Sequence, residues 1–110
     1  MTKNRFHDYI MSFDNVQIEY PYTETTAVYK VKYNDTEKIV AIIEEASNPL
    51  KISLRCDPQL AKHLRDKYEE VQPGVNLNEK YWNTILNTGQ LDDSDIKDLI
   101  RLSYDLSTTQ

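Results

Sequence analysis

The sequence has little of what disulfide-stapled, linker-rich or membrane-spanning proteins need. Its single cysteine, Cys56, cannot form a disulfide within the chain, so the fold does not depend on an oxidising compartment. Two glycines and four prolines are too few for a low-complexity chain. The longest aliphatic run, Ile39 to Ile43, is far shorter than the ~20 residues that cross a bilayer. The segment 1–13 has no apolar signal-peptide core, so we expect a cytoplasmic protein with no membrane partner.

Positive charge is also scarce. The chain has 13 Lys and Arg residues against 18 Asp and Glu residues, which gives a formal net charge of −5, and no basic residues are consecutive. Affinity for nucleic acids comes largely from Lys and Arg that displace counterions at phosphates. An acidic chain therefore binds nucleic acid only if its cations gather on one face, and its bulk charge counts against nucleic acids and acidic membranes.

The chain lacks the residue patterns of known catalytic, metal and cofactor sites. Gly74 and Gly89 are isolated, so no phosphate-binding glycine loop exists and we expect no cofactor. Neither His7 nor His63 has a second His or Cys at metal-ligand spacing, so we expect no metal site. Cys56 precedes a helix start that would favour a thiolate, but a small buried core residue is the commoner role. These absences favour a binding protein over an enzyme.

A length of 110 residues is the size of one domain, and we expect a single domain over residues 1–110. Apolar periodicity and turn signals predict, in order, a helix at 3–13, strands at 16–20, 27–33, 38–44 and 50–56, a helix after Asp57-Pro58, a hairpin from 75–77 and 82–86, and a helix after Asp92 or Asp93. The uninterrupted apolar run at 38–44 predicts a strand buried on both faces. The short turns favour antiparallel pairing, so the fold class is α+β, an antiparallel sheet with helices on one face.

The strand alternation also predicts which side chains share the face that the helices leave uncovered. A one-residue slip in register would invert this face, so the prediction depends on the pairing. The expected members are Gln17, Glu19, Lys30, Lys32, Lys51, Ser53 and Arg55. Four of them are cations, although the chain as a whole is acidic.

The segment Pro73 to Leu86 is unusual because it concentrates three asparagines, Tyr81 and the only tryptophan. Asn and Thr side chains that bond to the backbone can hold an irregular hairpin. The same groups beside an aromatic ring can also form a surface on which a base stacks. Composition alone favours the structural role, since a lone Trp usually lies in a core.

The second half of the chain resembles the MmcQ/YjbR family. The matching motifs are Leu54-Arg55-Cys56-Asp57-Pro58, Pro73-Gly74, Leu77-Asn78, Lys80, Trp82-Asn83-Thr84 and Ser103-Tyr104. The first half fits more loosely, through Tyr20-Pro21-Tyr22 and residues 28–31. The chain departs from the family at Asn76 and Tyr81, where histidines are common, so roles that need those imidazoles are lost.

The resemblance implies a YjbR-like or secretion-chaperone-like fold, no enzymatic activity, and a proposed DNA-binding role through a double-wing arrangement of hairpins. We expect phosphate contacts from the uncovered face and further contacts from the hairpin. The expected contact residues are Lys30, Lys32, Lys51, Arg55, Lys80, Trp82, Asn83 and Thr84.

Two other functions remain open from the residues. A cytosolic protein-interaction adaptor would bind its partner along the exposed sheet face or edge, with eight tyrosines supplying contact area. A small-molecule or enzymatic site near the hairpin and Cys56 would need a pocket. The sequence leaves the oligomeric state open, with a monomer favoured.

Overall fold

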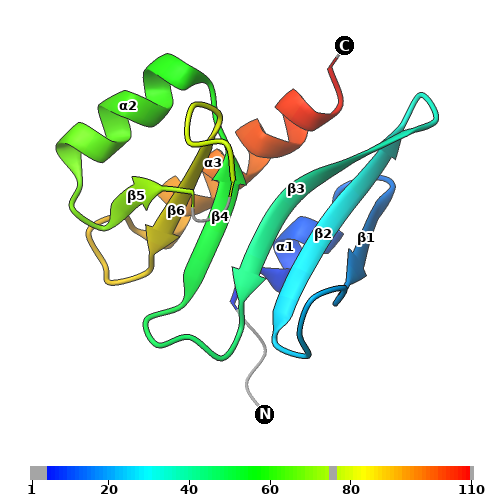
Figure 1. Ribbon diagram of the computed structural model, residues 1–110, viewed down its shortest axis with the longest axis horizontal. Helices are drawn as coiled ribbons and strands as arrows, with labels where there is room; N and C mark the ends of the chain where they lie inside the picture. Colours follow the sequence, from blue (N-terminus) through cyan, green and yellow to red (C-terminus); the bar gives the residue numbers. More distant parts are fainter. Residues whose placement is uncertain (1–4, 75–76, 110) are drawn as a thin grey trace.

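The computed structural model describes residues 5–74 and 77–109, which form a six-stranded antiparallel sheet and three helices (Figure 1). The helices are α1 (His7–Met11), α2 (Pro58–Lys67) and α3 (Asp93–Ser107). The strands are β1 (Val16–Glu19), β2 (Thr26–Tyr33), β3 (Thr36–Glu44), β4 (Lys51–Arg55), β5 (Val71–Pro73) and β6 (Trp82–Leu86). Their order in the sheet is β1-β2-β3-β4-β6-β5, and every neighbouring pair is antiparallel. The predicted α+β class is confirmed.

Local sequence signals explain where the helices and the central hairpin begin. The side chain of Asp57 accepts hydrogen bonds from the Gln59 and Leu60 amides, and Pro58 occupies the first turn of α2. Asp92 caps α3 in the same way, through the Asp95 amide at 2.8 Å. Asn34 and Asp35 both have positive φ, as the tight turn of a twisted two-stranded hairpin requires.

Two predicted boundaries are wrong. The first helix begins at His7 rather than at residue 3, and residues 3 and 4 lie outside the described residues. The first arm of the C-terminal hairpin is Val71–Pro73 rather than 75–77, of which residues 75 and 76 also lie outside the described residues. Gly74 follows the last residue of β5, donates its amide to the Trp82 carbonyl and packs closely against Trp82. A Cβ at Gly74 would come within 2.8 Å of the Trp82 Cβ.

One face of the sheet packs against the helices and forms the core. Its central side chains are almost completely buried. In β2 and β4 they alternate along the strand as the sequence predicts, whereas the consecutive residues Val40 and Ala41 of β3 both lie in the core. The core members are Phe6, Ile10, Ala27, Tyr29, Val31, Val40, Ala41, Ile43, Ile52, Leu54, Val71, Ile85, Leu91, Ile96 and Ile100, with Val16 at the edge. α2 lies on this face too, because the Asn83 side chain, beside Leu54 in register, donates to the Ala61 carbonyl.

The sheet separates between β3 and β4. Their pairing ends at Ala41 and Leu54, next to a bulge in the β2–β3 ladder, and α3 lies behind the separation (Figure 1). The Ser103 hydroxyl of α3 replaces the lost ladder bonds. It donates to the Val40 carbonyl at 2.5 Å and accepts from the Arg55 amide at 3.0 Å. The separated strand ends are therefore held by side chains from a third element.

Candidate nucleic-acid interface on the open face of the sheet

The face opposite the helices, here called the open face, has the residues that the alternation predicts. The register aligns Val28, Ile42, Ser53 and Thr84 in one row across four strands. The strand residues on this side are Gln17, Glu19, Thr26, Val28, Lys30, Lys32, Glu37, Ile39, Ile42, Glu44, Lys51, Ser53, Arg55, Trp82 and Thr84. The four predicted cations do share one face, as the sequence predicts.

Three of these cations have a carboxylate opposite them on the neighbouring strand. Lys30 Nζ lies 2.9 Å from Glu19 Oε2, and this hydrogen bond raises the pKa of the Lys30 ammonium. Lys32 faces Glu37 in the β2–β3 register, and Lys51 faces Glu44 in the β3–β4 register. Opposite charges across strands stabilise a sheet, so much of the positive potential of these residues is balanced in place.

Arg55 braces the separated strands. Its guanidinium lies 4.7 Å from the centre of the Trp82 ring and donates to the Ile39 carbonyl at 3.1 Å. Partial burial lowers the pKa of this guanidinium, and its Nε is buried with no hydrogen-bond partner among residues 5–74 and 77–109. The side chain is thus held by aromatic stacking and a backbone acceptor rather than being presented freely to solvent.

The hairpin residues expected to contact DNA are mostly inside the protein. Trp82, Asn83 and Thr84 are 6%, 3% and 2% exposed. The Asn83 side-chain oxygen accepts from Arg65 at 2.7 Å, and the Thr84 hydroxyl lies 2.8 Å from that of Ser53. The expected contact role does not fit these three, because their surfaces and polar groups are used within the fold. These residues instead attach β6 to its neighbours, α2 and β4.

Lys80 is the member of the hairpin set that remains exposed. Its Nζ lies 5.6 Å from the centre of the Tyr81 ring, and its amide is bonded to the Asn78 side chain. The expected contact set therefore reduces to Lys30, Lys32, Lys51 and Lys80, of which Lys32 and Lys80 are the most accessible.

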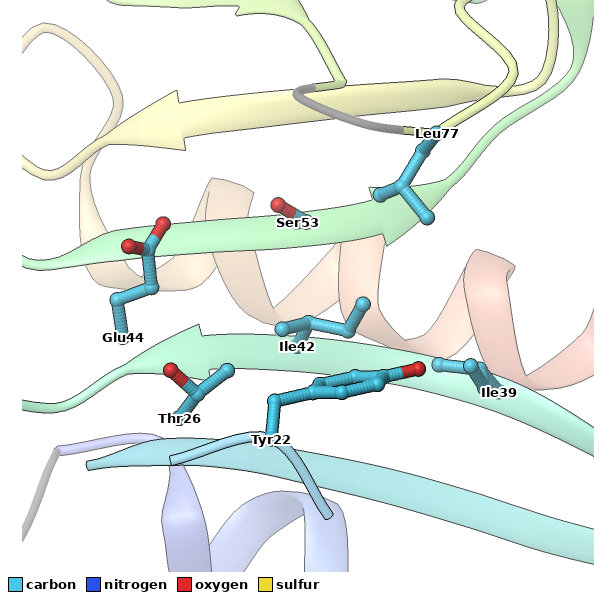
Figure 2. Close-up of a pocket in the computed structure, with 7 residues that line it drawn as sticks. All are labelled: Tyr22, Thr26, Ile39, Ile42, Glu44, Ser53 and Leu77. Atoms are coloured by element: carbon cyan, nitrogen blue, oxygen red, sulfur yellow. The ribbon is translucent and has the colours of Figure 1, made fainter. Parts of the chain in front are cut away.

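A pocket of about 460 Å³ opens on this face (Figure 2). It is lined by Tyr22, Thr26, Ile39, Ile42, Glu44, Ser53 and Leu77. Figure 2 shows Tyr22, from the segment before β2, and Leu77, from the β5–β6 connection, on opposite sides of Ile42. Aliphatic walls, one aromatic ring, one carboxylate and two hydroxyls give the pocket both apolar and polar character.

Sequence reasoning missed this pocket. It took the apolar run of β3 as buried on both faces, which is wrong for Ile39 and Ile42, since both are half-buried at the pocket. One sequence feature could have indicated the pocket: the aromatic residue Tyr22 in the segment Tyr20-Pro21-Tyr22. This segment served only as part of the resemblance to a family. A site made by three segments far apart in the chain has no local pattern to find.

Cys56 has the character of a core residue. Its side chain is buried, and burial, with the nearby Asp57 charge, raises the pKa of the thiol to about 11. A thiol with this pKa is protonated at neutral pH and is a poor nucleophile.

The histidines and acidic residues form no metal site within residues 5–74 and 77–109, where no three His, Cys, Asp or Glu side chains are grouped to hold an ion. His7 Nδ1 lies 3.0 Å from the Tyr29 hydroxyl, and His63 is exposed on α2. None of the helices in the described ranges is long and apolar enough to cross a membrane.

A family model described as YjbR matches residues 11–106. The Escherichia coli K12 protein YjbR, described as uncharacterized, is 35% identical over 75 residues, which are 68% of this chain and 62% of that protein. The match thus spans less than two thirds of that relative. The uncharacterized protein YbdF of Escherichia coli O157:H7 is 26% identical, over 96% of this chain and 87% of its own length.

Two solved structures have the same fold. A crystal structure of a Deinococcus radiodurans protein that carries the domain DUF419 superposes with a TM-score of 0.89 at 27% identity, covering 96% of this chain and 77% of that one. A crystal structure of a Pseudomonas syringae protein superposes with a TM-score of 0.77 at 26% identity, covering 97% and 99%. The agreement extends over nearly the whole chain.

Proposed function

This chain belongs to the YjbR family, and from that premise we propose that it is a non-enzymatic nucleic-acid-binding module that uses the open face and its two hairpins. The β2–β3 turn and the β5–β6 connection lie at the same end of the sheet, on either side of the place where β3 and β4 separate (Figure 1). This placement supports a double-wing mode, in which the two hairpins grip a strand or groove between them.

The observation that carries the proposal is the distribution of charge. Among the strand residues whose side chains lie on the open face, four are Lys or Arg, of 13 in the chain, and three are Asp or Glu, of 18. An acidic protein that binds phosphates must do so on its least acidic surface, because repulsion elsewhere opposes approach. Lys80 extends this surface onto the β5–β6 connection.

Carboxylates opposite the cations set the strength of this binding. A phosphate must compete with Glu19 for Lys30. It must also compete with Glu37 for Lys32 and with Glu44 for Lys51, since the two residues of each pair face each other across neighbouring strands. We therefore expect weak binding that is lost at physiological salt. With three or four phosphate contacts, the logarithm of the binding constant should fall with the logarithm of salt with a slope of about −2 to −4.

Fluorescence anisotropy with labelled oligonucleotides tests the proposal. Binding should be detectable at about 0.01 M salt, where charges interact over about 30 Å, and should fade at about 0.15 M. Lys32→Gln and Lys80→Gln should each weaken binding, whereas Glu19→Gln should strengthen it by releasing Lys30. Lys62→Gln, on the exposed surface of α2, is the matched control and should have little effect.

No binding of any oligonucleotide at low salt would overturn the proposal, because the electrostatic attraction is largest there. An equal loss in the Lys62 control would overturn the assignment to the open face. The Glu19→Gln variant gives a sharper test than the lysine variants. It is expected to bind more tightly, and damage to the fold would weaken binding rather than strengthen it.

A further inference from the structure

We infer that the pocket on the open face holds one unpaired nucleobase that carries an exocyclic amino group. This inference rests on the proposed function. It adds which part of the nucleic acid enters the protein, a single base, and where it binds, the pocket on the open face. The consequence is a preference for single strands over duplexes, and for cytosine or adenine over thymine.

The shape and walls of the pocket suit a flat ring. Its volume of about 460 Å³ lies in the range of small-molecule sites. Tyr22 is 71% exposed, the most exposed large hydrophobic side chain within residues 5–74 and 77–109, and its ring extends along β3 toward Ile39 (Figure 2). Ile42 and Leu77 supply aliphatic surface beside it. An exposed aromatic ring above an antiparallel sheet is a stacking platform for a base.

Glu44 selects what enters the pocket. Its carboxylate lines one end, and within the described residues it makes no ion pair and no side-chain hydrogen bond, although Lys51 faces it in register. A free carboxylate repels phosphate, so a phosphate group is not the occupant. It accepts a hydrogen bond from an amino group, as Glu and Asp do from cytosine N4. Thymine offers only an N–H between two carbonyl oxygens, both of which the carboxylate repels.

Two cations of the open face lie opposite residues that line the pocket, where the phosphates of an inserted nucleotide could meet them. Lys30 faces Ile39, which lines the pocket, in the β2–β3 register. Lys51 faces Glu44, another lining residue, in the β3–β4 register. The base thus meets a carboxylate inside the pocket, and the phosphate backbone of the nucleic acid meets cations outside it. A paired base would first have to leave its stack, which costs energy that a single strand does not spend.

The test compares labelled single-stranded oligo-dC, oligo-dA and oligo-dT, and a dC·dG duplex, by anisotropy at low salt. Oligo-dC should bind about tenfold more tightly than oligo-dT and more tightly than the duplex. Glu44→Gln should remove the difference between oligo-dC and oligo-dT. Tyr22→Leu should weaken binding of every single strand about tenfold and leave duplex binding unchanged.

Two matched variants serve as controls. Tyr33→Leu removes a tyrosine that is 40% exposed at the far end of β2, and Glu24→Gln removes a carboxylate of the segment before β2. Neither residue lines the pocket, and neither change should alter base preference. Unchanged thermal unfolding of all four variants shows that the fold is intact.

The outcomes separate this inference from the proposed function. Equal binding of all single strands and the duplex, with no effect of Tyr22→Leu or Glu44→Gln, overturns the base pocket and leaves nucleic-acid binding standing. Binding of no oligonucleotide overturns both. Tighter binding of the duplex than of oligo-dC also overturns the base pocket, because a paired base cannot enter it.

Discussion

The two faces of the sheet are made by the same strands, yet they are held in different ways. On the helix face, side chains such as Ile43 and Ile52 are completely buried in the core. On the open face, their sequence neighbours Ile42 and Lys51 are only half-buried, and charges pair across strands. The comparison teaches that the helix face supplies the stability through hydrophobic burial, while the open face supplies a polar surface that a ligand can use.

The two faces are joined at the separation of β3 and β4. Ser103 reaches from the helix side to Val40 and the Arg55 amide, and the Arg55 side chain continues to the open side, where it stacks on Trp82. Arg55, Trp82 and Ser103 belong to the motifs on which the resemblance to the family is based. The motifs therefore specify first the architecture that holds the pocket, and only through it the surface that binds.

The largest expected difference between the faces is in core packing. Ile43→Ala should lower the free energy of unfolding by about 2–5 kcal/mol, because Ile43 is completely buried and leaves a cavity. Ile42→Ala, one residue along on the open face, should cost roughly half of that or less, since its side chain is already partly in solvent. Urea unfolding followed by circular dichroism measures both. Equal losses would contradict the division of roles.

The junction of the faces should be the next most sensitive place. Ser103→Ala removes the donor to the Val40 carbonyl and the acceptor for the Arg55 amide, and leaves both groups without that partner. We expect a loss of about 1–3 kcal/mol in the free energy of unfolding. Ser94→Ala, on the exposed side of the same helix, is the control and should change little. A similar effect of the two substitutions would show that Ser103 does not hold the separated strands.

The smallest effect concerns the thiol on the helix side and appears only at high pH. Burial raises the pKa of Cys56 from 9.0 to about 11, so between these values the unfolded chain releases its proton while the folded chain keeps it. Stability should therefore fall as pH rises through this window, by at most about 1.4 kcal/mol per pH unit from this group. The wild type should lose more stability over this pH range than the Cys56→Ala variant. The variant keeps all the tyrosines, which also titrate at high pH, so the difference between the two proteins reports the thiol.

Urea unfolding at a series of pH values measures that difference. A gap between wild type and Cys56→Ala that stays constant from below pH 9 to about pH 11 would contradict the burial of the thiol. A slow reaction of the thiol with a disulfide reagent in the native protein, and a fast one after unfolding, would support it.

Much of the fold could be predicted because its signals are local. The caps Asp57 and Asp92 act within three residues of themselves, and the alternation along β2 and β4 places Lys30 and Arg55 on the correct face. The position of β5 could not be predicted, because it depends on pairing with β6 and on the close packing of Gly74 against Trp82 across the hairpin. Composition alone favoured the structural role that Trp82, Asn83 and Thr84 have, but their partners could not be predicted because they are distant in sequence.

The sequence by itself determined the types of element, the starts of α2 and α3 and the side of the sheet that the residues of β2 and β4 take, because periodicity and capping act over one or two turns of chain. Only the tertiary structure decided that β6 lies between β4 and β5, that Ser103 bonds to an amide 48 residues away, and that Tyr22 and Leu77 enclose one pocket. These features arise from packing between segments far apart in the chain, and no short pattern encodes which distant surfaces will meet.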